Sequence, residues 1–238
     1  MFRNSYPVHG DRLTHLFIKN NKAKNNKVKM EIHLNEEFGR NIYQTILKYE
    51  LRKNLEIGSW DGTGSTKCFV DAMLQLDGDL FLGCLEILPE RINILKDLYK
   101  EIDFVHAVNN SSIDYTELFH KNFDEIWNSE YNKIAKMYSY ELVKSWYERD
   151  VELLKGVVQG SISNLNKEWD SVLIDGGEFT GYSEYLLLKE NTKVFFLDDV
   201  HNAFKCYQVY CELKSSDDWE LLFDLPNIRN GAAGFIKK

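Results

Sequence analysis

The sequence predicts an α/β protein with a Rossmann-like, doubly wound and mostly parallel seven-stranded sheet. Three observations predict it. Short apolar segments alternate with helical patterns, a glycine-rich turn follows the first of these segments, and two short apolar segments flank an Asn-Gly turn near the carboxyl end. Strands that alternate with helices form parallel sheets with right-handed crossovers. The final pair predicts an antiparallel hairpin.

The expected elements follow one another from Glu36 onward. Phe38, Ile42 and Ile46 recur at helical spacing and predict a first helix over residues 36–49. Pro89 suits the first turn of another helix. Further helices are expected at 63–76, 89–99 and 203–213, and strands are expected in a segment ending at Ile57 and at 79–86, 103–108, 169–175, 193–197, 220–223 and 233–236.

One domain, residues 35–238, is expected after an amino-terminal arm at 1–34. The arm carries a basic run at 19–29, which favours a solvated segment. Residues 115–155 are aromatic and charged and exceed the roughly 10–12 residues that a plain crossover needs. This block predicts a helical insertion. Two interpretations stay open, a cap over an acceptor site or a helical layer whose aromatic side chains pack into the core.

Composition excludes several classes of function. The 238 residues carry a net charge of −8, which argues against nucleic-acid binding. No apolar run approaches the ~20 residues of a membrane-spanning helix, and the amino terminus lacks the apolar core of a signal peptide. The four cysteines show no C-x-x-C spacing, which favours free thiols in a reducing compartment. We therefore expect a cytoplasmic protein.

The glycine-rich turn at residues 58–64 predicts a site for a nucleotide-like cofactor. Its glycines follow G-x-x-x-G-x-G, and an acid stands two residues before the first of them. A strand, a glycine turn and a helix hold such cofactors in doubly wound folds. Dinucleotide-binding loops follow G-x-G-x-x-G instead. The spacing therefore argues against a dinucleotide.

Carboxylates close four of the predicted strands, and in a parallel sheet these ends meet at one edge. Three of the acids, Asp175, Asp198 and Asp199, would repel one another unless a cation or protons neutralised them. Hard oxygen ligands of this kind suit Mg²⁺. The alternative is that Asp199 caps the following helix and no metal binds.

Residues 55–66 resemble motif I of class I S-adenosylmethionine (SAM)-dependent methyltransferases. The Ile-Asp-Gly segment at 174–176 and the Leu-Asp-Asp segment at 197–199 resemble the metal-dependent O-methyltransferases, and residues 174–181 with 197–199 resemble the FkbM-like type of bacterial polysaccharide and secondary-metabolite clusters. The resemblance covers residues 35–238 and leaves out the arm and the insertion. It implies a cofactor set of Glu56, Gly58, Ser59, Gly62, Gly64, Ser65, Glu86, Ile87, Asn109, Ser111 and Asp175.

The resemblance also implies a role for several of these side chains. Glu86 would accept hydrogen bonds from the ribose hydroxyls, and Mg²⁺ on Asp175, Asp198 and Asp199 would position the acceptor. Two strand registers leave the adenine contact open: Asn109 or Ser111 follows a strand at 103–108, whereas Ser161 serves if the strand is 157–161.

The general base departs from the pattern of the family. Such enzymes commonly carry Lys or His three residues after the first metal ligand, and here Glu178 occupies that position. His201, two residues beyond the acidic pair, is the rival base. Arg229, in the hairpin turn, could reach an anionic substrate.

The expected activity is SAM-dependent transfer of a methyl group to a hydroxyl of a sugar, glycan or small molecule. A homo-oligomer is compatible with the sequence. One alternative is a non-catalytic SAM-binding or scaffold protein, which the replaced base favours. The other is a nucleotide-dependent Rossmann oxidoreductase. Its Tyr-x-x-x-Lys pairs occur at Tyr49/Lys53, Tyr140/Lys144 and Tyr185/Lys189, but its glycine loop is absent.

Overall fold

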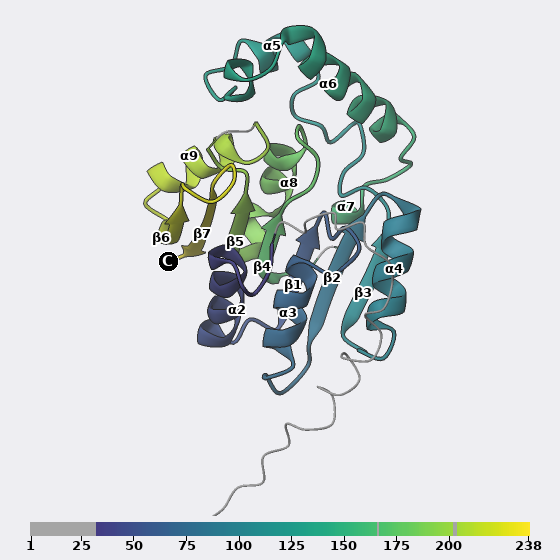
Figure 1. Cartoon of the computed structure of the whole chain (residues 1–238), viewed down its shortest axis with the longest axis vertical. Coiled ribbons are helices and arrows are strands. Elements are labelled where there is room, and N and C mark those ends of the chain that lie inside the picture. Colours follow the sequence, from purple (N-terminus) through teal and green to yellow (C-terminus); the bar gives the residue numbers. More distant parts are fainter. Residues whose placement is uncertain (1–31, 166, 202–203) are drawn as a thin grey trace, which may run out of the picture. The chain divides into compact units, whose positions relative to one another are not determined.

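In the computed structural model, seven strands form one sheet in the order β3-β2-β1-β4-β5-β7-β6 (Figure 1). The structure describes residues 32–165, 167–201 and 204–238, so residues 1–31 of the predicted arm, with its basic run, lie outside the described residues. Strands β1 to β5 are parallel, and β7 pairs antiparallel with β5 and β6. The seven strands are β1 (Lys53–Ile57), β2 (Phe81–Glu86), β3 (Val105–Asn109), β4 (Trp169–Ile174), β5 (Thr192–Asp198), β6 (Trp219–Leu225) and β7 (Ala232–Lys237). The predicted sheet and its terminal hairpin are confirmed.

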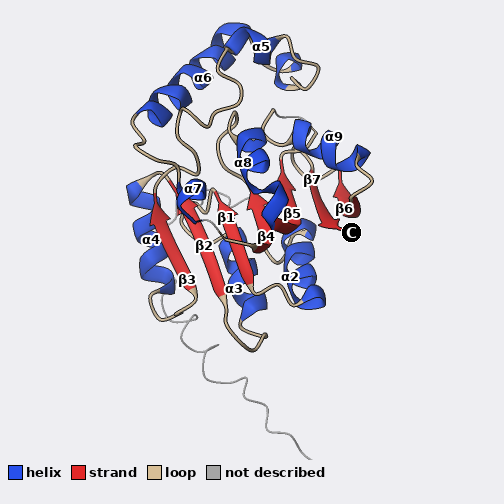
Figure 2. Cartoon of the chain, turned by 180° about the vertical axis from the view of Figure 1, so that it is seen from behind, coloured by secondary structure: helices blue, strands red, loops and turns tan. Residues whose placement is uncertain are grey.

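Helices cover both faces of this sheet. Helices α2, α3 and α4 lie on one face, and α7, α8 and α9 lie on the other (Figure 1, Figure 2). The described helices are α2 (Glu37–Tyr49), α3 (Ser65–Met73), α4 (Pro89–Tyr99), α5 (Phe123–Trp127), α6 (Tyr140–Lys155), α7 (Ser161–Leu165), α8 (Gly181–Leu188) and α9 (Tyr207–Ser215), with short 3-10 turns η1 (Ile134–Lys136) and η2 (Lys189–Asn191).

Alternate side chains of the central strands enter different layers of the core. In β5, Phe196 packs edge-on against Phe69 of α3, with ring centroids 6.0 Å apart. Its neighbour Phe195 packs instead against Tyr185 of α8, at 5.5 Å. Successive side chains of a strand point to opposite faces, and both faces of this strand are covered by helices. The central strands therefore form continuous apolar runs in the sequence.

Helix α8 is absent from the sequence-based expectation. Its consecutive residues Ser183, Glu184 and Tyr185 are all buried. Because burial extends around the helix, the apolar residues do not recur at the 3.6-residue period that marks an amphipathic helix. Tertiary packing of the whole segment, rather than one apolar stripe, accounts for this helix.

The predicted insertion contains α5, η1 and α6 and lies above the carboxyl ends of the parallel strands in both views (Figure 1, Figure 2). Its own aromatic rings hold it together: Phe123 lies 6.0 Å from Trp127, 5.1 Å from Tyr140 and 5.6 Å from Tyr147, measured between ring centroids. Tyr147 also packs against Phe179 of the loop after β4, at 5.4 Å. The insertion is therefore attached to a loop that follows a central strand.

Candidate active site

The parallel strands end side by side at one edge of the sheet. Paired residues form a row across four of them: Ile57, Leu85, Ile174 and Leu197. Glu86, Asp175 and Asp198 each come directly after a residue of this row. The topology therefore brings the strand-end acids to the same edge as the glycine loop.

The glycine loop passes close to the backbone of β4. Gly58 has a left-handed backbone (φ +85°), and a Cβ at this position would lie 2.1 Å from the carbonyl oxygen of Asp175. The N–H groups of Gly58 and Ser59 both donate to the carbonyl of Leu85, at 3.0 and 3.1 Å. Only glycine tolerates both the conformation and the close approach. The loop is thereby fixed to β2 and β4.

The remainder of the loop is also tied to its surroundings. The carbonyl of Gly62 accepts a hydrogen bond from the Tyr99 hydroxyl at 2.7 Å, and Gly64 is the N-cap of α3. Trp60 has a left-handed backbone at φ +50°. The guanidinium of Arg91 stacks on its ring, 4.0 Å from the centroid. A non-glycine residue in this region of φ/ψ space is uncommon and often accompanies a functional loop.

Glu56 lies inside the loop and has no exposed surface. Its carboxylate accepts hydrogen bonds from the hydroxyls of Ser65 (2.5 Å) and Thr66 (2.6 Å), in the first turn of α3. Burial raises the pKa of Glu56, and the hydroxyl donors oppose the shift. These contacts join the end of β1 to the start of α3. A direct contact of Glu56 or Ser65 with a cofactor stays a prediction, and the enclosed carboxylate favours a role in holding the loop.

Glu86 closes β2 with both carboxylate oxygens bound by backbone donors. Oε2 accepts from the N–H of Trp60 at 3.0 Å, and Oε1 accepts from the N–H of Leu88 at 2.9 Å. Burial raises the pKa of Glu86, and these N–H groups oppose the shift. The Asn109 amide donates to the carbonyls of Glu86 and Ile87, at 2.9 and 3.0 Å. Glu86 is therefore held in one orientation beside the glycine loop.

The two alternatives for the adenine contact converge on one place. The third strand is β3. Residues 157–161 do not form a strand, because this segment is a loop that leads into α7. The N–H groups of Ser161 and Ile162 donate to the carbonyls of Ser111 and Ser112, both at 3.0 Å. Ser111 and Ser161 are therefore neighbours, and both are buried. The Ser161 hydroxyl has no hydrogen-bond partner among the described residues.

Three carboxylates form an acid cluster, by which we mean Asp175, Asp198 and Asp199, and they converge with ligand oxygens within 4.8 Å of one another. Two cations of the chain already meet them. The Lys205 ammonium lies 2.8 Å from Oδ1 of Asp175 and 2.7 Å from Oδ2 of Asp199. The Arg229 guanidinium lies 2.5 Å from Oδ1 of Asp198. Protein cations thus neutralise much of the charge for which the sequence predicts a metal ion.

The environment acts differently on each acid of the cluster. Burial raises the pKa of Asp175 against the opposing Lys205 charge, and burial with the neighbouring Asp175 and Asp199 charges raises that of Asp198. At Asp199, burial is the largest influence and acts in the same sense, but the charge and hydrogen bond of Lys205, the Asn230 hydrogen bond and the Arg229 charge together outweigh it and lower the pKa. Asp199 also has a left-handed backbone at φ +56°. Strained backbone of this kind is typical of functional loops.

The first predicted base, Glu178, lies next to the segment that carries Lys205. Its Oε1 accepts hydrogen bonds from the N–H groups of Phe204 (2.7 Å) and Lys205 (3.4 Å). Burial raises the pKa of Glu178, and the Lys205 charge opposes the shift. A carboxylate with a raised pKa is a stronger base than an exposed one. Glu178 therefore combines a structural contact with the properties of a base.

The second predicted base, His201, is occupied elsewhere. Its Nε2 lies 3.1 Å from Oδ1 of Asp224, on β6, and its ring packs edge-on against Tyr210. Its backbone N–H donates to the carbonyl of Asn230 at 2.8 Å. These contacts favour a structural role for His201 at the hairpin, and its function as a base stays a prediction.

The chain is similar in structure to several solved methyltransferases. One is a Staphylococcus aureus protein assigned as a caffeoyl-CoA O-methyltransferase, at 15% identity over 85% of this chain and 84% of that chain, with a TM-score of 0.53. A second is the O-methyltransferase TomG from Streptomyces achromogenes, solved with SAM, at 12% identity over 84% and 79% and a TM-score of 0.53. A third is a Geobacter sulfurreducens methyltransferase at 10% identity over 85% and 80%, with a TM-score of 0.52. The chain has a class I methyltransferase fold.

These likenesses concern the fold. No protein-family model and no curated protein matches this sequence. Within the methyltransferase fold, the strand-end acids and the glycine loop lie where doubly wound sheets bind their ligands. Among the described residues no helix combines the length and the apolar character needed to cross a membrane.

Two side chains of the site escaped the sequence analysis. Lys205 follows the acidic pair by six residues and is one of 29 lysines and arginines, so no spacing distinguishes it. Glu184 of α8 is fully buried and accepts a hydrogen bond from the Ser112 hydroxyl at 2.5 Å. A carboxylate within an otherwise apolar segment is the one signal that could have identified Glu184, because acids are almost never fully buried without a partner.

The insertion approaches the loop after β4 at a second point. A Cβ at Gly177 would lie 3.9 Å from a carboxylate oxygen of Asp150, on α6. Burial raises the pKa of Asp150, and its pairing with Arg149 opposes the shift. Together with the contact between Tyr147 and Phe179, this places α6 beside the segment between Asp175 and Glu178.

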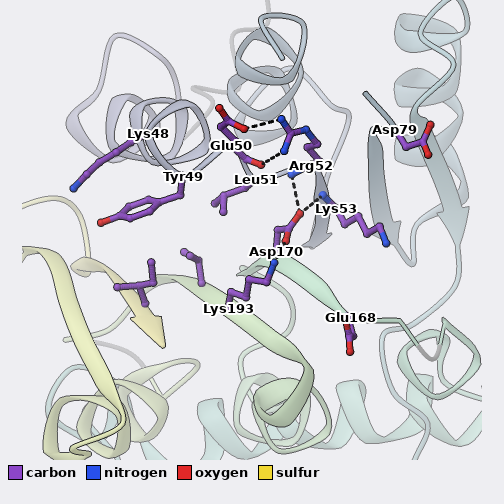
Figure 3. Close-up of a pocket in the computed structure, with 12 residues that line it drawn as sticks. Lys48, Tyr49, Glu50, Leu51, Arg52, Lys53, Asp79, Glu168, Asp170 and Lys193 are labelled. Carbon is purple, nitrogen blue, oxygen red and sulfur yellow. Dashed lines mark hydrogen bonds and ion pairs between the residues drawn. The ribbon is translucent and has the colours of Figure 1, made fainter. Parts of the chain in front are cut away.

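A cavity of about 770 Å³ lies at the opposite, amino-terminal edge of the sheet (Figure 3). None of the residues predicted for the methyltransferase site lines it. Four of its charged side chains form ion pairs: Arg52 with Glu50 at 2.7 Å and Lys193 with Asp170 at 2.6 Å. Because ligands of doubly wound folds bind at the carboxyl edge, we assign the chemistry to the acid-lined edge.

Proposed function

We propose that the chain is a SAM-dependent O-methyltransferase that acts on a hydroxyl of a sugar, glycan or small molecule. The observation that carries the proposal is the oriented Glu86 carboxylate, which stands beside the glycine loop at the same edge as the acid cluster. Glu86 and the glycine loop suit an adenosine, and the acid cluster suits a polar acceptor. The FkbM-like resemblance of the loops after β4 and β5 supports the choice of a glycan.

The residues present fit the cofactor. Glu86 would receive the ribose hydroxyls. The Ser161 hydroxyl, buried and without a partner among the described residues, would bond the adenine together with Ser111. The missing side chain of Gly58 lets the glycine loop lie against the Asp175 backbone, which brings the loop to the edge that carries these side chains. These features offer polar contacts along one line of the sheet edge.

When bound, SAM supplies an electrophilic methyl group, whose bond to sulfur breaks as the acceptor oxygen bonds to its carbon, leaving S-adenosylhomocysteine (SAH) and a methyl ether. Glu178 would take the proton that the hydroxyl loses. Its Oε1 makes the hydrogen bonds found among the described residues, which leaves Oε2 for the proton. The insertion would cap the acceptor and exclude water. Correct placement of the two reactants can supply much of the rate enhancement.

The metal expected from the sequence does not fit the acid cluster as the chain arranges it. The donor set suits Mg²⁺, but Mg²⁺ binds oxygen at about 2.0–2.1 Å. The Lys205 ammonium already lies against two of the three carboxylates, at 2.7 and 2.8 Å. We therefore derive no catalytic step from a metal.

The remaining proposals concern the setting of the protein. All four cysteines are free thiols, which supports a place in the reducing cytoplasm. We propose that the enzyme acts there on an acceptor of low molecular weight or on a glycan precursor, before export. A homo-oligomer remains part of the proposal and is measurable by light scattering.

The test is transfer of radiolabelled methyl groups from SAM to a panel of oligosaccharides, nucleotide sugars and small polyols. We expect a methyl ether on at least one acceptor class, located by mass spectrometry, and loss of product in Asp175→Asn. The control is Asp170→Asn, at the opposite edge of the sheet. Transfer to nitrogen or carbon but never to oxygen would contradict the proposal.

A second candidate, a non-catalytic SAM-binding protein, is favoured by one observation: Glu178 already holds the Phe204 backbone. It predicts SAH binding without transfer to any acceptor. The acceptor panel, used together with SAH calorimetry, separates the two candidates.

A further inference from the structure

The positive charge of Lys205 balances negative charge of the acid cluster. Its side chain is 11% exposed, and its ammonium bridges carboxylates from two different strand ends. A buried charge is tolerated when opposite charges and hydrogen bonds compensate it. The Asp175 and Asp199 carboxylates compensate the buried Lys205 ammonium, and the ammonium in turn compensates these two carboxylates.

The backbone around Lys205 is also fixed in place. Glu178 accepts hydrogen bonds from the N–H groups of Phe204 and Lys205. A Cβ on Gly181 would lie 2.3 Å from the Lys205 carbonyl oxygen, so the first residue of α8 must be glycine for this segment to approach. Glu178 of the loop after β4 thus binds the segment that carries the Lys205 ammonium, and Gly181 of α8 gives that segment the space to approach.

The geometry around Lys205 suits an ammonium better than a divalent ion. An ammonium at 2.7–2.8 Å from its oxygens needs a wider cage than Mg²⁺, whose oxygens lie at about 2.0–2.1 Å. A metal bound to the same oxygens would also face the positive charge of Lys205 at close range. Asp198 is drawn to Arg229 on its other side. The cluster is therefore supplied with cations by the chain itself.

We propose that the Lys205 ammonium permanently takes the place of a divalent metal at this site, and that it donates a hydrogen bond to the acceptor oxygen. Among the described residues, Asp175 and Asp199 take two of its three N–H donors, and the third is available to the acceptor. The contact with the acceptor rests on the proposed function. The exclusion of metal rests on the cluster alone.

The test is binding of Mn²⁺ alone, followed by electron paramagnetic resonance and calorimetry without SAM or acceptor. Wild type is expected to show no binding at the cluster at 1 mM Mn²⁺. Lys205→Met removes the charge but keeps most of the stem, and we expect it to bind Mn²⁺ at least tenfold more tightly than wild type. Lys193→Met, which removes an exposed lysine at the far edge, is expected to match wild type. Adding Asp199→Asn to Lys205→Met should abolish the gain.

A folded Lys205→Met variant that binds Mn²⁺ no more tightly than wild type would overturn the proposal. If the variant does not fold by circular dichroism, wild type alone decides. If wild type binds Mn²⁺ and Asp199→Asn abolishes this binding, a metal displaces Lys205 and the proposal is wrong. If wild type shows no such binding, the result supports the proposal. Calorimetry with SAH on the same samples keeps the outcomes apart: failure to bind SAH counts against the proposed function and leaves the metal result unaffected.

Discussion

At the scale of single residues, Glu86 offers the most direct chemistry toward a methyl donor. Backbone N–H groups from two loops hold its carboxylate, so its orientation is set before any ligand arrives. Preorganised acceptors lose little freedom on binding, and each hydrogen bond to a charged group contributes about 1.5–3 kcal/mol.

Glu86→Gln is expected to weaken SAH binding about tenfold or more, because an amide offers one acceptor oxygen where the carboxylate offers two. A tenfold change corresponds to about 1.4 kcal/mol. Calorimetry measures it. The matched control is Glu90→Gln, an exposed position four residues further along the chain, which should bind SAH as wild type does. Equal affinity in both variants would remove Glu86 from the site.

The same residue predicts how SAH affinity depends on pH. The charged form of Glu86 accepts the ribose hydroxyls best, so affinity should fall as the carboxylate is protonated. Burial raises the pKa of Glu86, so the fall begins at a higher pH than for an exposed glutamate, whose pKa is about 4.3. Glu86→Gln should remove this pH dependence. An affinity that rises on acidification would contradict the assignment.

Glu184 predicts the pH dependence of stability. Burial raises its pKa in the folded state, and the Ser112 hydroxyl opposes the shift. A carboxyl with a raised folded pKa destabilises the fold when both states are ionised, and this cost disappears as pH falls through the folded pKa. Glu184→Gln should therefore have a higher free energy of unfolding than wild type at pH 8. This gain over wild type should be smaller at pH 5. Urea unfolding measures it, and exposed Glu190→Gln is the control; an equal difference at both pH values would contradict it.

At the scale of elements, the loop between β1 and α3 depends on the backbone of Gly58. Gly58→Ala places a methyl group against the Asp175 carbonyl in a left-handed conformation. We expect a loss of about 3 kcal/mol or more in the free energy of unfolding, from overpacking together with backbone strain. Gly78→Ala is the matched control, because its φ is also positive (+99°) but its nearest neighbour is a side-chain atom 3.6 Å away.

The control isolates the close approach from the backbone conformation. Gly78→Ala should lose about 1–2 kcal/mol, the cost of a left-handed residue alone. Chemical denaturation of both variants gives the comparison. Similar losses at the two positions would mean that the close approach of the loop to β4 has no energetic weight.

The insertion should be separable from the cofactor site. Tyr147 joins it to the loop after β4 through Phe179 and donates to the His120 carbonyl at 3.0 Å. Tyr147→Ala is expected to increase hydrogen exchange across 123–155 while SAH affinity stays within about twofold, since Glu86 and the glycine loop are untouched. Tyr138→Ala, an exposed ring of the same segment, is the control. Loss of SAH binding in Tyr147→Ala would contradict this division.

At the scale of the whole molecule, the sequence predicted the sheet because each central strand is apolar on both faces and each is followed by a helix or a loop with clear signals. Element boundaries moved by a few residues. Helix α8 was missed because its burial hides the helical period, and the strand alternative at 157–161 was wrong because that segment instead enters α7 beside Ser111.

The acids of the candidate site were predicted, and Arg229 was singled out for an anionic substrate rather than for its pairing with Asp198, whereas Lys205 was missed. Residues at the carboxyl ends of strands are placed by topology, so Glu86, Asp175 and Asp198 could be found from spacing. Lys205 arrives through an irregular segment whose path depends on Glu178 and Gly181. No local pattern encodes such a path. A metal ion was expected because the three acids were considered without the Lys205 ammonium that pairs with two of them.

The carboxyl edge of the sheet, with Glu86 and the glycine loop, is expected to bind the methyl donor. Isothermal titration calorimetry of the wild-type chain with SAH tests it most directly, because SAH binding requires no knowledge of the acceptor. We expect one site per chain with a dissociation constant in the micromolar range, weakened by Glu86→Gln. Absence of binding at millimolar SAH would contradict it.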